Sequence, residues 1–157
     1  MVRHTTGSGD WGPFTDDLQG TDDEGPQGSG LDNYSWTVPW DSEMVEEFLF
    51  ATGDCAHWLI ATPTAVGGPL TGEYYSNDKR DILMSSTNDD SYTAKWYNRA
   101  AKDEDPWISL SNHGTEDVLY GESSSSRWVD LKNAHSGANV YIRSATTATG
   151  VEQMFSG

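Results

Sequence analysis

The chain has 157 residues, of which 25 are acidic and nine are Lys or Arg, and its formal net charge is -16. This excess of acids argues against nucleic acid as a partner, because phosphates bind to basic surfaces. The single cysteine excludes an internal disulfide, and no apolar run has the length of a membrane span or the form of a secretion signal. The acidity suits molar salt, in which screening weakens repulsion within the chain. We therefore expect a soluble, salt-adapted protein with neither a membrane nor a nucleic acid as partner.

Residues 1–43 are predicted to form an extended acidic arm. Most of the acidic excess precedes residue 48, and residues 7–30 contain only Trp11, Phe14 and Leu18 as sizeable apolar groups. Such a segment buries too little surface to offset the entropy lost when it becomes ordered. Either the arm is a solvated tail, or it orders against a partner with Trp11 and Phe14 as anchors.

Residues 44–143 have the periodicity of short strands. Residues 92–98, for example, place Tyr92, Ala94 and Trp96 on one face and polar groups on the other. Turn residues separate the segments. We predict an all-β fold, an antiparallel β-sandwich or jelly roll. The predicted strands cover residues 46–52, 57–62, 73–75, 81–86, 92–98, 106–111, 118–121, 127–132 and 138–143.

Residues 41–50 leave one alternative open. Ser42 is followed by glutamates and by apolar residues at helical spacing, which would place acids near the positive end of a short helix. A helical turn at residues 93–102 is a similar alternative. Neither helix would change the predicted all-β class.

Cys55 and His57 are the strongest candidates for chemistry. On a strand they would face the same side, as a nucleophile and base or as two metal ligands. No second cysteine completes a zinc site, and the other histidines are isolated in the sequence. The acidic turns lack the ligand spacing of a calcium loop. We therefore predict a buried structural cysteine beside a surface histidine, and no catalytic residue, metal or cofactor.

Aromatic residues make up 11% of the chain and supply a candidate binding face. Trp107, Trp128 and Tyr141 alternate with aliphatic residues in three predicted strands. If the aliphatic residues face the core, the three rings face outward. They would then stack on sugars, form a subunit interface, or be covered within the monomer.

Residues 144–157 form a tail that carries a single charge, Glu152. The tail is predicted either to close the sheet as a last strand or to reach a neighbouring subunit. In the second case Val151, Met154 and Phe155 are the predicted contacts.

An acidic arm, a β domain with an aromatic face and a low-charge tail together resemble the small structural proteins of tailed virus particles. Such proteins include capsid decoration, turret, collar and baseplate components, and the acidity implies a halophilic archaeon as host. The resemblance concerns architecture; the segment Gly137-Ala-Asn-Val-Tyr-Ile-Arg143 merely looks like a terminal strand of a sandwich. No functional residue is carried over from a family.

What the resemblance implies is a non-enzymatic virion protein that is assembled in the host cytoplasm. Its partners would be further copies of itself and other virion structural proteins. The alternative is a carbohydrate-binding β-sandwich that attaches the particle to host-surface glycans through the same rings.

Overall fold

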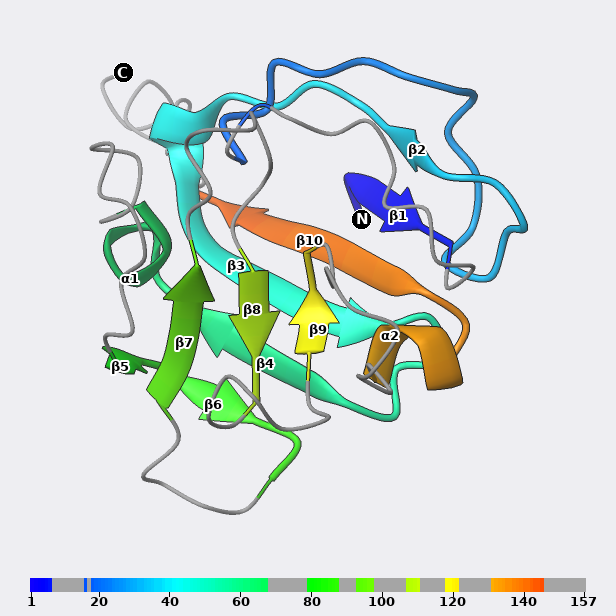
Figure 1. Ribbon diagram of the computed structural model, residues 1–157. Helices are drawn as coiled ribbons and strands as arrows, with labels where there is room; N and C mark the ends of the chain where they lie inside the picture. Colours follow the sequence, from blue (N-terminus) through cyan, green and yellow to red (C-terminus); the bar gives the residue numbers. More distant parts are fainter. Residues whose placement is uncertain are drawn as a thin grey trace, which may run out of the picture.

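Ten strands in two antiparallel sheets dominate the part of the chain that the computed structural model describes (Figure 1). At residues 79–81, 93–97, 107 and 133 it describes the backbone alone. The described residues are 1–6, 16, 18–67, 79–87, 93–97, 107–110, 118–121 and 131–145.

The larger sheet has six strands in the order β2-β1-β10-β3-β4-β6. Its two longest strands, β3 and β10, lie side by side in the centre, where Ala138 pairs with Thr52 and Ile142 with Phe48. The strands are β1 (Arg3–Thr5), β2 (Trp36–Thr37), β3 (Val45–Thr52), β4 (Trp58–Ala61), β6 (Met84–Ser85) and β10 (Ala138–Ser144).

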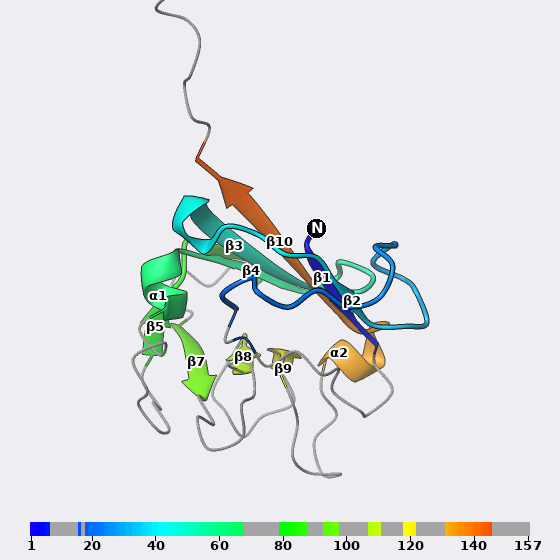
Figure 2. The same cartoon turned by 90° about the horizontal axis from the view of Figure 1, so that it is seen from above.

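A smaller sheet, in the order β5-β7-β8-β9, lies over one face of the larger one (Figure 2). The remaining elements are two short helices and one 3₁₀ turn. The strands are β5 (Lys79–Asp81), β7 (Thr93–Tyr97), β8 (Trp107–Ser109) and β9 (Val118–Tyr120), and the other elements are α1 (Pro63–Gly67), α2 (Leu131–Ala134) and η1 (Ser42–Met44).

The hydrophobic core lies between the two sheets. Alternate residues of the central strands, among them Phe50, Leu59 and Val140, point toward the smaller sheet and are almost completely buried. From the smaller sheet, Tyr120 meets Phe50 at a ring-centroid distance of 5.6 Å. Burying each such side chain stabilises the folded state by roughly 1.5–3 kcal/mol. The prediction of a mostly β fold is therefore confirmed.

The first residues belong to the larger sheet, which differs from the arm predicted for residues 1–43. Strand β1 lies between β2 and β10, and Arg3, His4 and Thr5 are fully buried. Leu18 is part of the core. Strands β1 and β2 and Leu18 are therefore packed into the β domain, whereas most residues of the loop 21–35 are exposed. The polar side chains of β1 find hydrogen-bond partners that lie far away in the sequence, and these partners make their burial possible.

The predicted strands at residues 46–52, 57–62, 92–98, 106–111, 118–121 and 138–143 correspond to β3, β4, β7, β8, β9 and β10. The helix considered for residues 41–50 is limited to η1, which Asp41 caps by accepting a hydrogen bond from the Glu43 N–H at 3.0 Å. Beyond η1 the chain continues as β3, in which Phe48 and Phe50 belong to the core.

Two predicted strands differ from the structure. Leu131 and Lys132, expected at the end of a strand, begin helix α2. The segment 81–86 is divided between the end of β5 and β6, which belong to different sheets. The strand predicted at residues 73–75 lies outside the described residues, as do residues 127–130.

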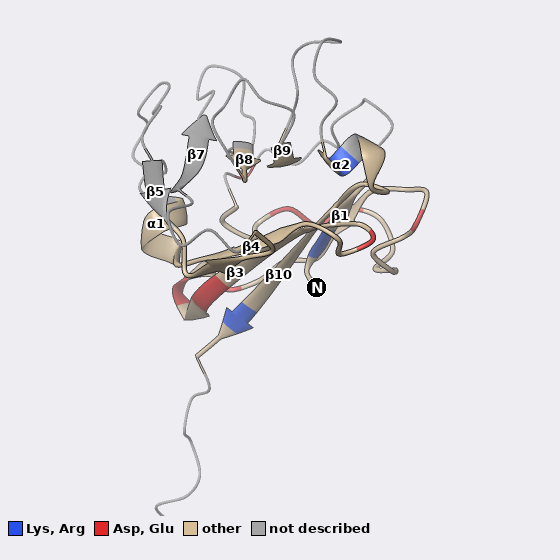
Figure 3. Cartoon of the chain, turned by 90° about the horizontal axis from the view of Figure 1, so that it is seen from below, with Lys and Arg blue, Asp and Glu red and all other residues tan. Residues whose placement is uncertain are grey.

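The described basic side chains, Arg3, Lys132 and Arg143, lie on β1, α2 and β10, whereas most described acids lie in loops and at the start of β3 (Figure 3). Among the residues that the structure describes, no helix has the length and apolarity needed to cross a membrane.

Candidate functional site

The face of the larger sheet that points away from the smaller sheet carries a row of apolar side chains. Tyr141 pairs with Leu49, Leu49 with Ile60, and Ile60 with Met84. Directly paired residues of antiparallel strands project from the same face. These four residues therefore form one continuous row across β10, β3, β4 and β6, which we call the outer row.

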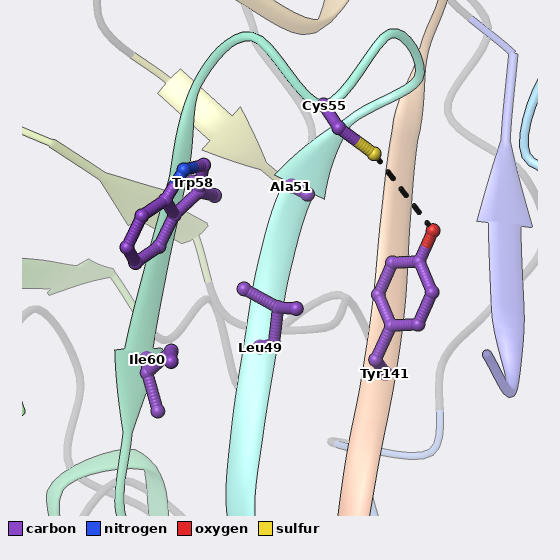
Figure 4. A pocket seen from close by; sticks show the side chains of 6 residues that line it. All are labelled: Leu49, Ala51, Cys55, Trp58, Ile60 and Tyr141. Carbon is purple, nitrogen blue, oxygen red and sulfur yellow. Dashed lines mark hydrogen bonds between the residues drawn. The ribbon is translucent and has the colours of Figure 1, made fainter. Parts of the chain in front are cut away.

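Part of the outer row lines a hollow of about 450 Å³ (Figure 4). Ala51 and Trp58, which pair with each other two register positions along and so on the same face, extend its floor. Cys55 contributes from the turn between β3 and β4. We call this feature the outer hollow. It is lined by Leu49, Ala51, Cys55, Trp58, Ile60 and Tyr141.

The remaining half of this face is covered by the loop before β2. The His4 ring contacts the Asn139 side chain through Nδ1 at 2.7 Å and the Asp32 carbonyl oxygen through Nε2 at 2.9 Å. The Asn139 amide donates to the carbonyl of Gly30 at 3.3 Å. Gly30 lies so close to this amide that a side chain at residue 30 would collide with it. The loop thus stops at the start of β10 and leaves the outer hollow open.

The hollow itself is apolar, and the next pair on the same face of β3 and β10, Glu47 with Arg143, is an exposed ion pair that borders it. Met84, at the end of the outer row, is 60% exposed, and Leu83 beside it is 55% exposed. None of the residues that line the outer hollow is Asp, Glu, Lys, Arg or His. In a chain with a net charge of -16, this uncharged surface is a local exception.

Tyr141 and Cys55 supply polar atoms at the edge of the hollow. The tyrosine hydroxyl lies 4.0 Å from the Cys55 sulfur. Burial, followed by the neighbouring cysteine, raises the pKa of Tyr141 above its usual value. The Tyr141 hydroxyl therefore stays protonated to a higher pH than that of an ordinary tyrosine.

Cys55 differs from its prediction as a buried structural residue on a strand. It is exposed and lies in the turn between β3 and β4, with a φ of 59°. A turn residue has no fixed strand face, so the predicted alignment of Cys55 with His57 does not arise. Its partner in the structure is Tyr141.

His57 and His135 are neighbours, although the histidines are isolated in the sequence. Their ring centroids lie 4.6 Å apart, and Nδ1 of His135 lies 2.8 Å from a carboxylate oxygen of Asp54. The backbone N–H of Ala56 lowers the pKa of Asp54 to about 2, with further help from the Thr52 hydroxyl and His135. Within the described ranges, no three possible ligands are arranged to hold a metal ion.

Of the predicted contact residues, Tyr141 lies on the outer hollow. Trp107 belongs to β8 in the smaller sheet, so it is not on the sheet that carries Tyr141, and the predicted common face of the three aromatic residues does not arise. The alternation within each segment does not specify which sheet the segment joins. The side chain of Trp107 and the other predicted contacts, Trp11, Phe14, Trp128, Val151, Met154 and Phe155, lie outside the described residues.

The sequence contains a signal for the site that our prediction did not use. Residues 48–51 and 58–61 are apolar on both strand faces. In an antiparallel sheet with one solvated face, apolar and polar residues alternate, and an uninterrupted apolar run indicates that both faces are covered. The outer face of β3 and β4 therefore has the apolar composition of a covered face.

Comparison with protein-family models, with curated protein sequences and with solved structures finds no match for this chain. Its function is therefore argued from the outer hollow and the outer row.

Proposed function

We propose that this chain is a non-enzymatic assembly protein and that the outer hollow is its contact with another copy of itself. The observation that carries the proposal is the outer row, Tyr141, Leu49, Ile60 and Met84, which lies at the surface without a charged residue. Contiguous apolar surface on a soluble protein marks an interaction site. Interface cores are enriched in aromatic residues and methionine and depleted of charge.

Ile60 at the centre of the outer row is the residue with which to test this proposal. In molar KCl the unchanged chain is expected to be oligomeric by light scattering, and Ile60→Asp is expected to be monomeric. Leu31→Asp is the matched control, because Leu31 is 66% exposed and does not line the hollow. A chain that is monomeric without any substitution would overturn self-assembly.

A carbohydrate-binding protein is the second candidate, because the rings of Trp58 and Tyr141 both border the hollow. Against it, the floor between them is formed by Leu49, Ala51 and Ile60, which offer no side-chain hydrogen bond to a sugar hydroxyl. If this candidate is right, Trp58→Ala abolishes binding to a panel of surface glycans and leaves the oligomeric state unchanged.

The paired sheets support a β-sandwich of jelly-roll type as the finer description of the fold. The pairing within both sheets is antiparallel, and the core connects Phe50 of one sheet to Tyr120 of the other. The acidic composition supports a habitat of high salt.

The biological setting that we propose is the particle of a tailed virus of a halophilic archaeon. Capsid decoration, turret, collar and baseplate proteins need a contact face, and the apolar outer row is the feature of this chain that would serve as one. Mass spectrometry of purified particles tests the proposal by asking whether the chain is present in a fixed ratio to the major capsid protein. Its absence from the particles would overturn a virion role.

A further inference from the structure

The described part of the chain ends a few residues beyond the outer hollow. Tyr141 lines the hollow, and the described chain ends four residues later at Ala145. The N–H of Ala145 donates to the Met44 carbonyl at 2.8 Å, which continues the pairing of β10 with the segment before β3. Where the described part ends, the backbone therefore runs away from the hollow of its own chain.

The residues that follow match the hollow in charge. The segment 146–157 carries one charged residue, Glu152, and offers Val151, Met154 and Phe155 as apolar groups. Placing an acidic segment against this uncharged surface would remove its charges from water without compensation. This nearly neutral segment incurs little of that cost.

The length of the segment is also sufficient. An extended chain spans at most about 3.3–3.6 Å per residue, so the ten residues from Ala145 to Phe155 reach roughly 33 Å. This is about three times the spacing of about 10 Å between two packed sheets. The apolar residues of one copy can therefore reach the outer face of a neighbour.

We propose that the segment 146–157 of one copy occupies the outer hollow of a neighbouring copy, with Met154 and Phe155 as its anchors. This inference rests on the proposed assembly function and deepens it by naming the occupant. Each copy then donates a segment and accepts one, so the contact joins two different surfaces head to tail. Such contacts close into rings or continue as filaments.

Mixing two full-length variants tests this arrangement. The donor-deficient variant, Met154→Asp with Phe155→Asp, retains its hollow, and the acceptor-deficient variant, Ile60→Asp, retains its segment. Each variant alone is expected to be monomeric in molar KCl. Their equimolar mixture is expected to form a dimer of one copy of each, detected by native mass spectrometry. Leu31→Asp is the control and should assemble as the unchanged chain does.

The outcomes separate this inference from the proposed function. If Ile60→Asp is monomeric and the donor-deficient variant still assembles, the hollow is an interface with another occupant, and only the inference fails. If both variants are monomeric and the mixture does not form a dimer, the inference also fails. An unchanged chain that is monomeric overturns the assembly function itself.

The single cysteine allows a second test that does not depend on a disruptive substitution. Cys55 lines the hollow and is exposed. Under mild oxidation, Ser156→Cys is expected to give disulfide-linked dimers and larger species on a non-reducing gel, because a disulfide requires the two Cα atoms to approach within about 7 Å. The additional substitution Cys55→Ser should remove the species larger than a dimer. A linked product that migrates only as a monomer would show that the segment docks on its own chain, which would overturn the exchange between copies.

Discussion

The guanidinium of Arg3 lies 2.9 Å from the carboxylate of Asp16, and solvent reaches 0% and 2% of the two side chains. The Arg3 guanidinium also donates to the Thr37 hydroxyl and to the Tyr120 hydroxyl, each at 3.0 Å. Its central carbon lies 4.9 Å from the centre of the Trp40 ring. One buried cation thus connects β1, β2 and β9, and therefore both sheets.

Removing the anion of this pair should be costly. Asp16→Ala leaves the Arg3 charge buried without its counterion, and breaking a buried pair in this way typically costs about 3–5 kcal/mol. We expect the free energy of unfolding, measured by urea titration in molar KCl, to fall by that amount.

The exposed ion pair at the other end of the sheet is the control for this experiment. Arg143 lies 2.8 Å from Glu47, and 64% of the Arg143 side chain is exposed. Surface pairs contribute about 0–1 kcal/mol, so Arg143→Met should have a small effect. Equal losses for the two variants would contradict the structural role of Arg3 and Asp16.

Acid should destabilise the protein partly through Asp54. The pKa of Asp54 is about 2 in the folded chain, below its usual value of 3.8. At a pH between these two values, the Asp54 carboxyl binds more protons in the unfolded chain than in the folded chain. Asp54 therefore contributes its full stabilisation above its unfolded pKa, and this contribution is lost as the pH falls toward its folded pKa. The melting temperature of the unchanged chain should therefore fall between about pH 4 and pH 2. Asp54→Asn should show a shallower fall, and an unchanged slope would contradict the assignment.

Asn139 should be needed to hold the first strand in place. Its side chain contacts His4 at 2.7 Å, and both residues are buried. Asn139→Ala leaves the His4 ring nitrogen without this partner, and an unsatisfied buried group costs about 1–3 kcal/mol. We expect a loss of this size in chemical unfolding. Ser144→Ala, at the exposed end of the same strand, should change stability by less than about 0.5 kcal/mol.

Dilution of salt should destabilise the protein. The acidic side chains that give the net charge of -16 repel one another. This repulsion extends over a Debye length of about 10 Å at 0.1 M ionic strength and only about 3 Å at 1 M. The melting temperature should therefore rise with KCl concentration. Sucrose at equal osmolality is the control, because it does not screen charge. An equal rise in sucrose would indicate solvent exclusion in place of screening.

Strands were predicted most successfully from the sequence where burial of one face produces a recognisable pattern of apolar residues. Phe48 and Phe50 are buried and alternate with the partly exposed Glu47 and Leu49, and this segment forms β3 as predicted. The strand β1 could not be predicted in this way, because Arg3, His4 and Thr5 have no apolar alternation. Their burial depends on partners supplied by the fold.

Prediction of the candidate site was partial for a related reason. Tyr141 was identified from the alternation within its strand, and it does line the outer hollow. Leu49, Trp58 and Ile60 were not identified, because each looks like a core residue when its strand is considered alone. The apolar runs indicate that both faces of these strands are covered, but the sheet order, with β3 and β4 adjacent, is needed to distinguish an outer-face residue from a core residue.

The pairing of β1 with β10, which places Arg3 opposite Val140, has a consequence for how the chain folds. During synthesis, β1 and β2 can pair only with each other until almost the whole chain has been made. Contacts between such distant residues form slowly, because the entropy of closing the loop is lost before the contact is gained. Strand β1 consists of Arg, His and Thr, which remain hydrated before β10 has been made. A polar unpaired strand is also less prone to aggregation than an apolar one.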